Sequence, residues 1–255
     1  MQKAVELRSQ GLTLRGMLHM PDNTTHKVPV VVLFHGLTGS KMEPHFIFVK
    51  LSRMLEKKGI ASVRFDLGGS GESDGDFINM TLSGEIRDAH NILDYAKELD
   101  GIDSGRIGLL GLSMGGSVAS ALAGERKDEI NSLCLWAPAG NVSEVALSDK
   151  SAAEIDFVRK IGYVERGGLL LGSDFIDDIL NLNIFETAKS FGKKVLIIHG
   201  DKDTSVPLSV SEKYLKYYDG RAELKIIKDA DHTFNNSNWE KKVLEYTAAY
   251  FEEEL

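Results

Sequence analysis

Hydrophobic residues in this chain fall into short, nearly continuous runs that alternate with longer stretches of helical spacing. Two brief alternating segments, 4–7 and 12–17, predict an antiparallel hairpin. The later runs are rich in β-branched residues, as is typical of strands covered on both faces. They occupy residues 28–34, 61–65, 106–110, 132–136, 195–199 and 224–227. Helices are expected at residues 46–58, 85–99, 113–123, 209–218 and 239–253. This alternation predicts an α/β fold, with a largely parallel sheet and helices on both of its faces.

One region departs from the alternation. From about residue 141 to about residue 190 no strong buried strand is visible, and glycines and carboxylates mix with aliphatic residues. We interpret this region as an insertion over one end of the sheet, because roughly 50 residues exceed the usual length of a connection. The alternative is a plain helical crossover with loose ends. The expected domains are a core of residues 1–140 and 191–255 and a cap of residues 141–190.

The sequence Gly111-Leu112-Ser113-Met114-Gly115 lies between an expected strand and an expected helix. A serine nucleophile has to project from a sharp strand-to-helix turn, and glycines on both sides remove side chains that would collide there. The N-terminus of the helix then directs unpaired N–H groups toward developing negative charge. The same pattern also fits a serine that only caps a helix, so the partner residues decide between the two.

An acid and then a histidine are expected after later strands if this serine is a nucleophile. The next-to-last strand is followed by Asp201 and Asp203, and the last strand is followed by His232. Asp203 is favoured as the acid because it lies deeper in its loop, whereas Asp201 is expected to cap the turn. His232 is the expected base. His199, at a strand end, is assigned a packing or structural role.

Acyl transfer also needs hydrogen-bond donors for the oxyanion of the tetrahedral intermediate. The first parallel strand ends in His35-Gly36-Leu37, a glycine-containing turn able to present the Leu37 amide. The Met114 amide, directly after the serine, is the expected second donor. The alternative for His35-Gly36 is an ordinary strand-to-helix loop.

These motifs together resemble the α/β-hydrolase superfamily, and they span nearly the whole chain. They are Phe34-His35-Gly36-Leu37, residues 66–75, Gly111 to Gly115, His199-Gly200-Asp201-Lys202-Asp203 with Val206-Pro207, and Asp231-His232. Residues 63–66 running into Ser73-Asp74-Gly75, residues 136–139 and the insertion further resemble bacterial cinnamoyl and feruloyl esterases. The resemblance implies an eight-stranded sheet, a small cap after the sixth strand, and hydrolysis of esters with hydroxycinnamates among the candidate acids.

Composition and charge narrow the classes of partner. The chain has 255 residues, with 30 basic against 38 acidic side chains and a net charge of −8, which argues against a nucleic-acid partner. The longest aliphatic run is far shorter than the ~20 residues of a membrane span. No nucleotide-binding motif or zinc spacing is present, so we expect no cofactor and no metal. The single cysteine, Cys134, and the absence of a visible export signal favour a cytoplasmic location.

The sequence therefore predicts a serine carboxylic ester hydrolase acting on small or aromatic acyl esters, with Ser113, Asp203 and His232 as a catalytic triad. The expected partner is a small-molecule ester, and a homodimer is left open. Two alternatives remain at this point. One is a monoacylglycerol lipase, lysophospholipase or acyl-peptidase on the same fold, and the other is a non-catalytic binding module.

Overall fold

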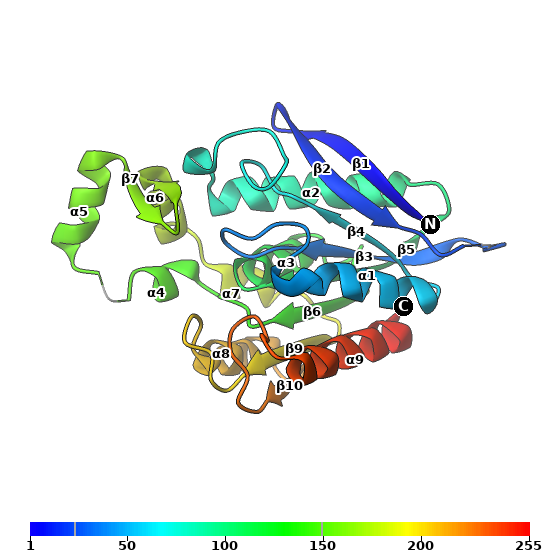
Figure 1. The fold of residues 1–255 in the computed structure, drawn as a ribbon. Helices are drawn as coiled ribbons and strands as arrows, with labels where there is room; N and C mark the ends of the chain where they lie inside the picture. The colour runs from blue at the N-terminus through cyan, green and yellow to red at the C-terminus, as the bar shows by residue number, and fades with distance from the viewer. Residues whose placement is uncertain (23, 149) are drawn as a thin grey trace.

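The computed structural model describes residues 1–22, 24–148 and 150–255, and its centre is one eight-stranded sheet (Figure 1). In spatial order the strands are β1 (Gln2–Ser9), β2 (Leu12–His19), β4 (Ala61–Phe65), β3 (Val28–Phe34), β5 (Ile102–Leu112), β6 (Ser132–Trp136), β9 (Val195–Gly200) and β10 (Ala222–Ile227). β1 pairs with β2, and β2 with β4, in the antiparallel direction. Each neighbouring pair from β4 to β10 is parallel. The mostly parallel sheet expected from the sequence is confirmed, and the fold is that of the α/β hydrolases.

Helices cover both faces of the sheet (Figure 1). One face carries α2 (Leu82–Glu98), α3 (Met114–Glu125), α7 (Ile184–Ala188) and α8 (Leu208–Tyr218), and the other carries α1 (Ile47–Lys57) and α9 (Ser237–Glu254). Two short 3₁₀ helices, η1 (Pro44–Phe46) and η2 (Phe77–Asn79), lie in loops. Within the described residues no helix is both long and apolar enough to cross a membrane.

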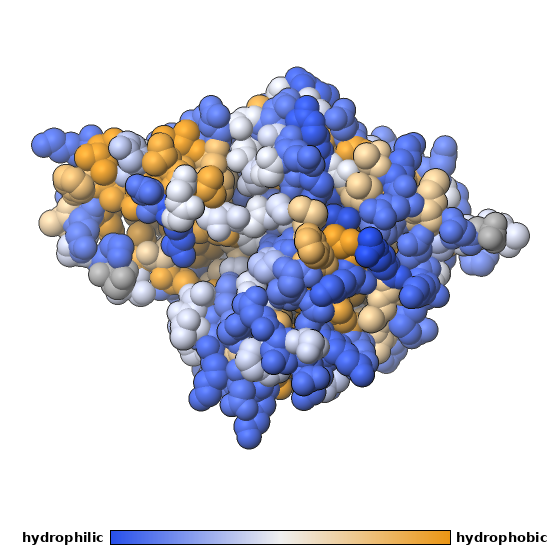
Figure 2. All heavy atoms as spheres, in the orientation of Figure 1, coloured by the Kyte–Doolittle hydropathy of each residue, from blue (hydrophilic) through white to orange (hydrophobic). Residues whose placement is uncertain are grey.

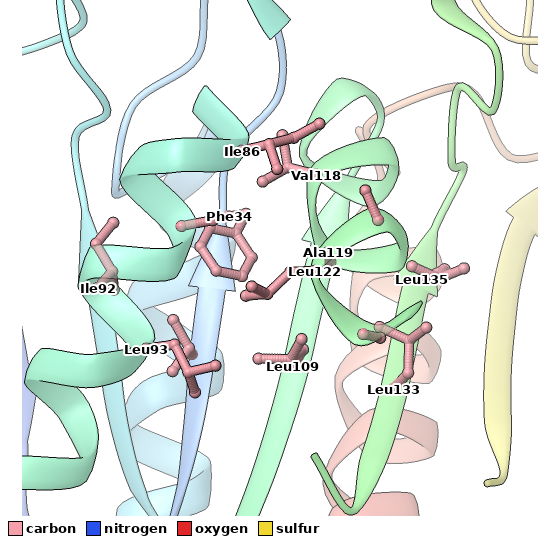
Figure 3. Close-up of a cluster of buried hydrophobic side chains, with 14 of the residues drawn as sticks. Phe34, Ile86, Ile92, Leu93, Leu109, Val118, Ala119, Leu122, Leu133 and Leu135 are labelled. Carbon is pink, nitrogen blue, oxygen red and sulfur yellow. The ribbon is translucent and has the colours of Figure 1, made fainter. Parts of the chain in front are cut away.

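The alternation of side chains along each strand divides the hydrophobic core into two layers. In β3, Val30, Val32 and Phe34 belong to the layer under α2 and α3. Val31 and Leu33 belong to the layer under α1 and α9. Both sets are buried, and this explains why the sequence of the strand is apolar without alternation. Figure 3 shows the first layer, in which side chains of α2 and α3 pack on those of β3, β5 and β6.

The segment 141–190 lies between β6 and β9 at the carboxyl end of the sheet (Figure 1). It contains α4 (Val142–Ala146), α5 (Ala152–Ile161), an antiparallel pair β7 (Tyr163–Arg166) and β8 (Leu169–Gly172), and α6 (Ser173–Leu180) before α7. β8 packs closely against η2. A Cβ at Gly172 would lie only 2.1 Å from the carbonyl oxygen of Ile78. α7 packs against α3 and α8, so the end of the segment adjoins the core. Residue 149 lies outside the described residues.

The outer part of this segment has an apolar surface. Figure 2 shows hydrophobic side chains gathered over the region of α5, β7 and α6, at the left of the molecule. The large exposed hydrophobic residues there are Phe157, Ile161, Tyr163, Leu169, Leu170 and Leu180. Inside the segment, Ile155, Val164, Leu171, Phe175 and Ile179 are among the residues that line a cavity of about 250 Å³.

Candidate active site

Ser113 occupies the sharp turn between β5 and α3. Its backbone has φ 56° and ψ −120°, a strained conformation for a residue with a side chain. The flanking glycines are required by close approach of the backbone. A Cβ at Gly111 would lie 2.0 Å from the carbonyl oxygen of Gly115, and a Cβ at Gly115 would lie 2.2 Å from that of Phe34. The collisions that a side chain was expected to cause at these two positions are therefore confirmed.

The backbone of Ser113 is fixed on both sides of the turn. Its N–H donates to the carbonyl oxygen of Trp136 at 2.9 Å, and its own carbonyl oxygen accepts from Gly116 and from Ala139 at 2.9 and 3.0 Å. The residue is partly exposed. Among the described residues its hydroxyl has no hydrogen-bond partner, so it is available to a ligand.

Asp203 and His232 come together in the structure. Oδ2 of Asp203 lies 2.6 Å from Nδ1 of His232, and the carboxyl group is fully buried. Oδ1 accepts from the backbone N–H groups of Ser205 and Val206, each at 2.8 Å. Because Nδ1 of His232 faces a carboxylate, we assign the proton to Nδ1, which leaves Nε2 free to act as a base.

His199 is a second histidine on the same carboxylate. Its Nε2 lies 3.1 Å from Oδ2 of Asp203 and 3.0 Å from the carbonyl oxygen of Val206. Two acceptors at Nε2 place the proton there, and Nδ1 then accepts from the hydroxyl of Ser211 at 2.6 Å. The structural hydrogen bond expected for His199 is therefore present, but the sequence did not reveal that its partner is the proposed catalytic acid.

The partners of Asp203 determine its charge state. Burial raises the pKa of the carboxyl group, but hydrogen bonds from His199 and His232 outweigh burial, and the net pKa lies well below the usual range. With two N–H groups on each oxygen, all its acceptor positions are used. Asp203 is thus held as a carboxylate that orients the imidazole of His232.

Asp201, the other acid considered for the triad, has a different partner. Its Oδ1 accepts from the backbone N–H of Asp229 at 2.5 Å, so it joins the β9 loop to the β10 loop. The expectation that Asp201 caps its own turn was wrong, because the N–H of a neighbouring loop lies within reach. Asp201 therefore makes neither of the histidine hydrogen bonds that Asp203 makes.

The turn after β3 lies directly beside Ser113. A Cβ at Gly36 would lie 3.2 Å from Cβ of Ser113. His35 is buried and fixes this turn: its Nε2 accepts from the Leu67 N–H at 3.0 Å, and its Nδ1 donates to the carbonyl oxygen of Gly36 at 2.9 Å. Burial lowers the pKa of His35, which favours this neutral form. In the described part of the chain the Leu37 and Met114 amides have no hydrogen-bond partner.

Two further residues of the site were not found from the sequence. The carboxyl group of Glu43 is buried and accepts from the Gly36 N–H at 2.6 Å. His45 lies 2.9 Å through Nε2 from the carbonyl oxygen of Thr233, the neighbour of His232, and its Nδ1 contacts Glu240. The sequence gives no signal for either residue, because both lie in a polar loop whose path depends on the fold.

The structure also limits what else the site could contain. No group of three or more His, Cys, Asp or Glu side chains within the described ranges could hold a metal ion. No hydrogen bond joins the Ser113 hydroxyl to His232 in those ranges. Catalytic hydrogen bonds of this kind commonly shorten only when substrate binds.

Known proteins resemble this chain over nearly its whole length. The sequence profile of the prolyl oligopeptidase family matches residues 47–255. The structure of Est1E from Butyrivibrio proteoclasticus with bound ferulic acid superposes with a TM-score of 0.89, at 27% identity, and the match covers 98% of this chain and 99% of that one. An uncharacterized 31.7 kDa protein from the traX-finO intergenic region of Escherichia coli is 23% identical over 228 residues, which are 86% of this chain and 74% of the relative.

A more distant solved structure shares the fold alone. The mouse α/β hydrolase domain-containing protein 10 superposes with a TM-score of 0.80 at 18% identity, covering 98% of this chain and 99% of that chain. The family profile begins within α1 and includes Ser113, Asp203 and His232.

Proposed function

Because this chain belongs to the prolyl oligopeptidase family and is a hydrolase of the α/β-hydrolase superfamily, we propose that it is a serine carboxylic ester hydrolase. Its substrates are small or aromatic acyl esters, with feruloyl and cinnamoyl esters as the first candidates. The observation that carries the proposal is the 2.6 Å contact between Asp203 and His232 in a fold that also holds Ser113 in a strained turn. Each of these three residues follows a parallel strand at its carboxyl end.

The proposed reaction has two steps. His232 takes the hydroxyl proton of Ser113 through Nε2 as the serine oxygen attacks the ester carbonyl, and the Leu37 and Met114 amides donate to the oxyanion. The alcohol leaves with the proton returned by His232. Water, deprotonated by the same imidazole, then attacks the acyl-enzyme, and His232 returns that proton to the Ser113 oxygen as the acid is released. Asp203 remains ionised throughout and stabilises the imidazolium form of His232.

Support for an aromatic or small acyl group comes from a solved relative. Est1E, which is 27% identical to this chain, was solved with ferulic acid bound. The cavity within segment 141–190 is a separate feature, because its lining contains none of Ser113, Asp203 and His232.

Peptide hydrolysis is the second candidate, and the family name is the observation that favours it. The same serine, histidine and oxyanion donors cleave amides as well as esters. A substrate panel separates the candidates: methyl ferulate and methyl cinnamate, p-nitrophenyl esters of increasing chain length, a monoacylglycerol, a lysophospholipid and aminoacyl p-nitroanilides. The proposal expects the highest kcat/KM on the aromatic or short-chain esters, and preference for the anilides or the lipids would replace it.

The catalytic assignment is tested with Ser113→Ala and with Ser190→Ala, an exposed serine after α7, as the control. Ser113→Ala is expected to remain folded and to lose ester hydrolysis by roughly 10⁶-fold, down to the background rate of the assay. Ser190→Ala is expected to behave as wild type. A fluorophosphonate probe should label wild type at Ser113 and leave Ser113→Ala unlabelled. Near-normal turnover by Ser113→Ala would reject the assignment, and an unlabelled wild type would favour the non-catalytic alternative.

A further inference from the structure

The loop between β3 and α1 has an unusually strained backbone. Thr38, Glu43, His45 and Phe46 all have positive φ. Glu43 is the extreme case, with φ 58° and ψ 164°, a region occupied almost only by glycine. Such a conformation persists where the surrounding structure fixes it, and it is concentrated at functional sites. A large acidic residue at this position therefore requires an explanation.

The contacts of the Glu43 side chain supply one. The carboxyl group points into the protein, and its Oε1 accepts from the Gly36 N–H at 2.6 Å. Gly39 leaves room for it, since a Cβ there would lie 2.7 Å from that oxygen. A Cβ at Gly36 would lie 3.7 Å from Oε1 and 3.2 Å from Cβ of Ser113. The carboxyl group thus lies beside the turn that borders the proposed nucleophile.

Both peptide groups that flank Gly36 are held by hydrogen bonds. In the peptide group before Gly36, the Gly36 N–H donates to the carboxyl group of Glu43. The peptide group after Gly36 contains the Leu37 N–H, and its carbonyl oxygen accepts from Gly39 at 3.0 Å and from His35 at 2.9 Å. In a trans peptide the N–H points away from the carbonyl oxygen. The Leu37 N–H is therefore directed away from these donors. Because residue 36 is a glycine, both peptide groups could rotate if these hydrogen bonds were absent.

The charges around Glu43 are few. Burial raises its pKa to about 7, while the Gly36 N–H and the charge of His232 favour the ionised form. On neighbouring elements the titratable groups are His232, after β10, and His35, after β3. In its own loop, Lys41 pairs with Asp66 and Glu72, and His45 pairs with Glu240.

We propose that Glu43 is a positioning residue, whose carboxyl group fixes the Gly36 peptide and hence the Leu37 oxyanion donor. This role rests on the proposed function and deepens it. This effect acts in the transition state, because the oxyanion develops only there. Loss of Glu43 should therefore lower kcat and leave KM nearly unchanged.

Two substitutions test the hydrogen bond from the Gly36 N–H. Glu43→Ala removes it, and we expect kcat for an aryl ester to fall about 100-fold, the cost of a misplaced catalytic group. Glu43→Gln keeps an oxygen that accepts from Gly36, so kcat should recover to within about 10-fold of wild type. KM should stay near the wild-type value in both variants. A purely structural role would change KM together with kcat.

Two more variants control for folding. Glu43→Gly and Glu43→Ala both leave the Gly36 N–H without its acceptor, but only glycine relieves the backbone strain. Glu43→Gly should therefore unfold at a higher temperature than Glu43→Ala and lose kcat to the same extent. Met42→Ala changes an exposed neighbour in the same loop and should leave kcat unchanged. If Glu43→Ala and Glu43→Gly both keep kcat within about twofold of an active wild type, the role of Glu43 is rejected while the proposed function stands. If wild type neither hydrolyses esters nor is labelled at Ser113, the proposed function fails and the role of Glu43 fails with it.

Discussion

Replacement of Asp203 by asparagine tests the proposed triad through its hydrogen bonds. The carboxylate accepts four N–H groups: His232 and His199 on Oδ2, and the Ser205 and Val206 amides on Oδ1. An amide has only one oxygen, so its NH₂ must face either the two histidines or the two backbone amides. If it faces the histidines, His232 accepts at Nδ1 and carries its proton on Nε2, where the serine needs a base. Loss of the correct tautomer in this way lowers kcat about 10⁴-fold in serine proteases.

The same change also has a cost in stability. An NH₂ that faces the histidines meets the Nε2–H of His199, and one that faces the loop meets the N–H groups of Ser205 and Val206. A buried unsatisfied donor costs about 1–3 kcal/mol. We expect Asp203→Asn to lower the free energy of unfolding by about 2 kcal/mol, which in a chain of this length lowers Tm by about 5 °C. Steady-state hydrolysis of p-nitrophenyl acetate and differential scanning calorimetry measure the two effects separately.

Asp201→Asn is the matched control, because it makes the same chemical change two residues away. Oδ1 of Asp201 accepts from the Asp229 N–H, and the oxygen of asparagine can accept the same bond. The control should keep kcat within a few-fold of wild type. An active Asp203→Asn beside an inactive Asp201→Asn would show that the acid was wrongly assigned, whatever the contacts of Asp203 in the folded chain.

Two further predictions concern the turn that carries Ser113 and a buried acid. Gly115→Ala would place Cβ 2.2 Å from the carbonyl oxygen of Phe34. We therefore expect this variant to lose about 1–3 kcal/mol of stability and about 100-fold in kcat. Gly192→Ala is the control, because no atom lies within 4 Å of its Cβ, and it should match wild type in thermal unfolding and ester assays. Equal behaviour of the two variants would refute the steric argument. Burial, and then the charge of Asp88, raise the pKa of Glu85 well above its ordinary value. The folded protein then binds this proton more tightly than the unfolded chain, and stability falls as pH rises above the ordinary pKa of glutamate. Glu85→Gln should remove this loss, so its Tm should exceed that of wild type at pH 8 by more than at pH 4, and parallel Tm curves against pH would contradict the assignment.

The strands were predictable where both faces are buried, and less so elsewhere. Residues 28–34 were expected as a strand and form β3 with the same bounds. β5 begins at Ile102, earlier than the expected residue 106. The first residues were missed because residues 103–105 are polar and lie outside the buried half of the strand. The β7–β8 pair was not expected at all. Its residues are mostly exposed, and an exposed pair leaves no hydrophobic alternation to detect.

The site was predictable in its residue types and not in its contacts. Ser113, Asp203 and His232 could be selected because each follows a strand, and parallel strands end at one edge of the sheet. The structure brings Asp203 and His232 into contact. The link from His199 to Asp203 and the inward turn of Glu43 depend on how loops fold over one another. Glu43 precedes Pro44 in a polar loop, which indicates an extended residue and nothing about the direction of its side chain.

Backbone strain shows where this fold gives up stability for geometry. Eight of the ten non-glycine residues with positive φ in the described ranges follow β3, β5, β6 or β10. Each such residue costs about 1 kcal/mol or more, and random placement would not gather them at one edge of a sheet. The two buried layers on either side of β3 supply the stability that tolerates this cost. Because the strained loops carry Ser113, Glu43 and the turn before His232, relief of strain there should raise stability without restoring turnover, as we expect when Glu43→Gly is compared with Glu43→Ala.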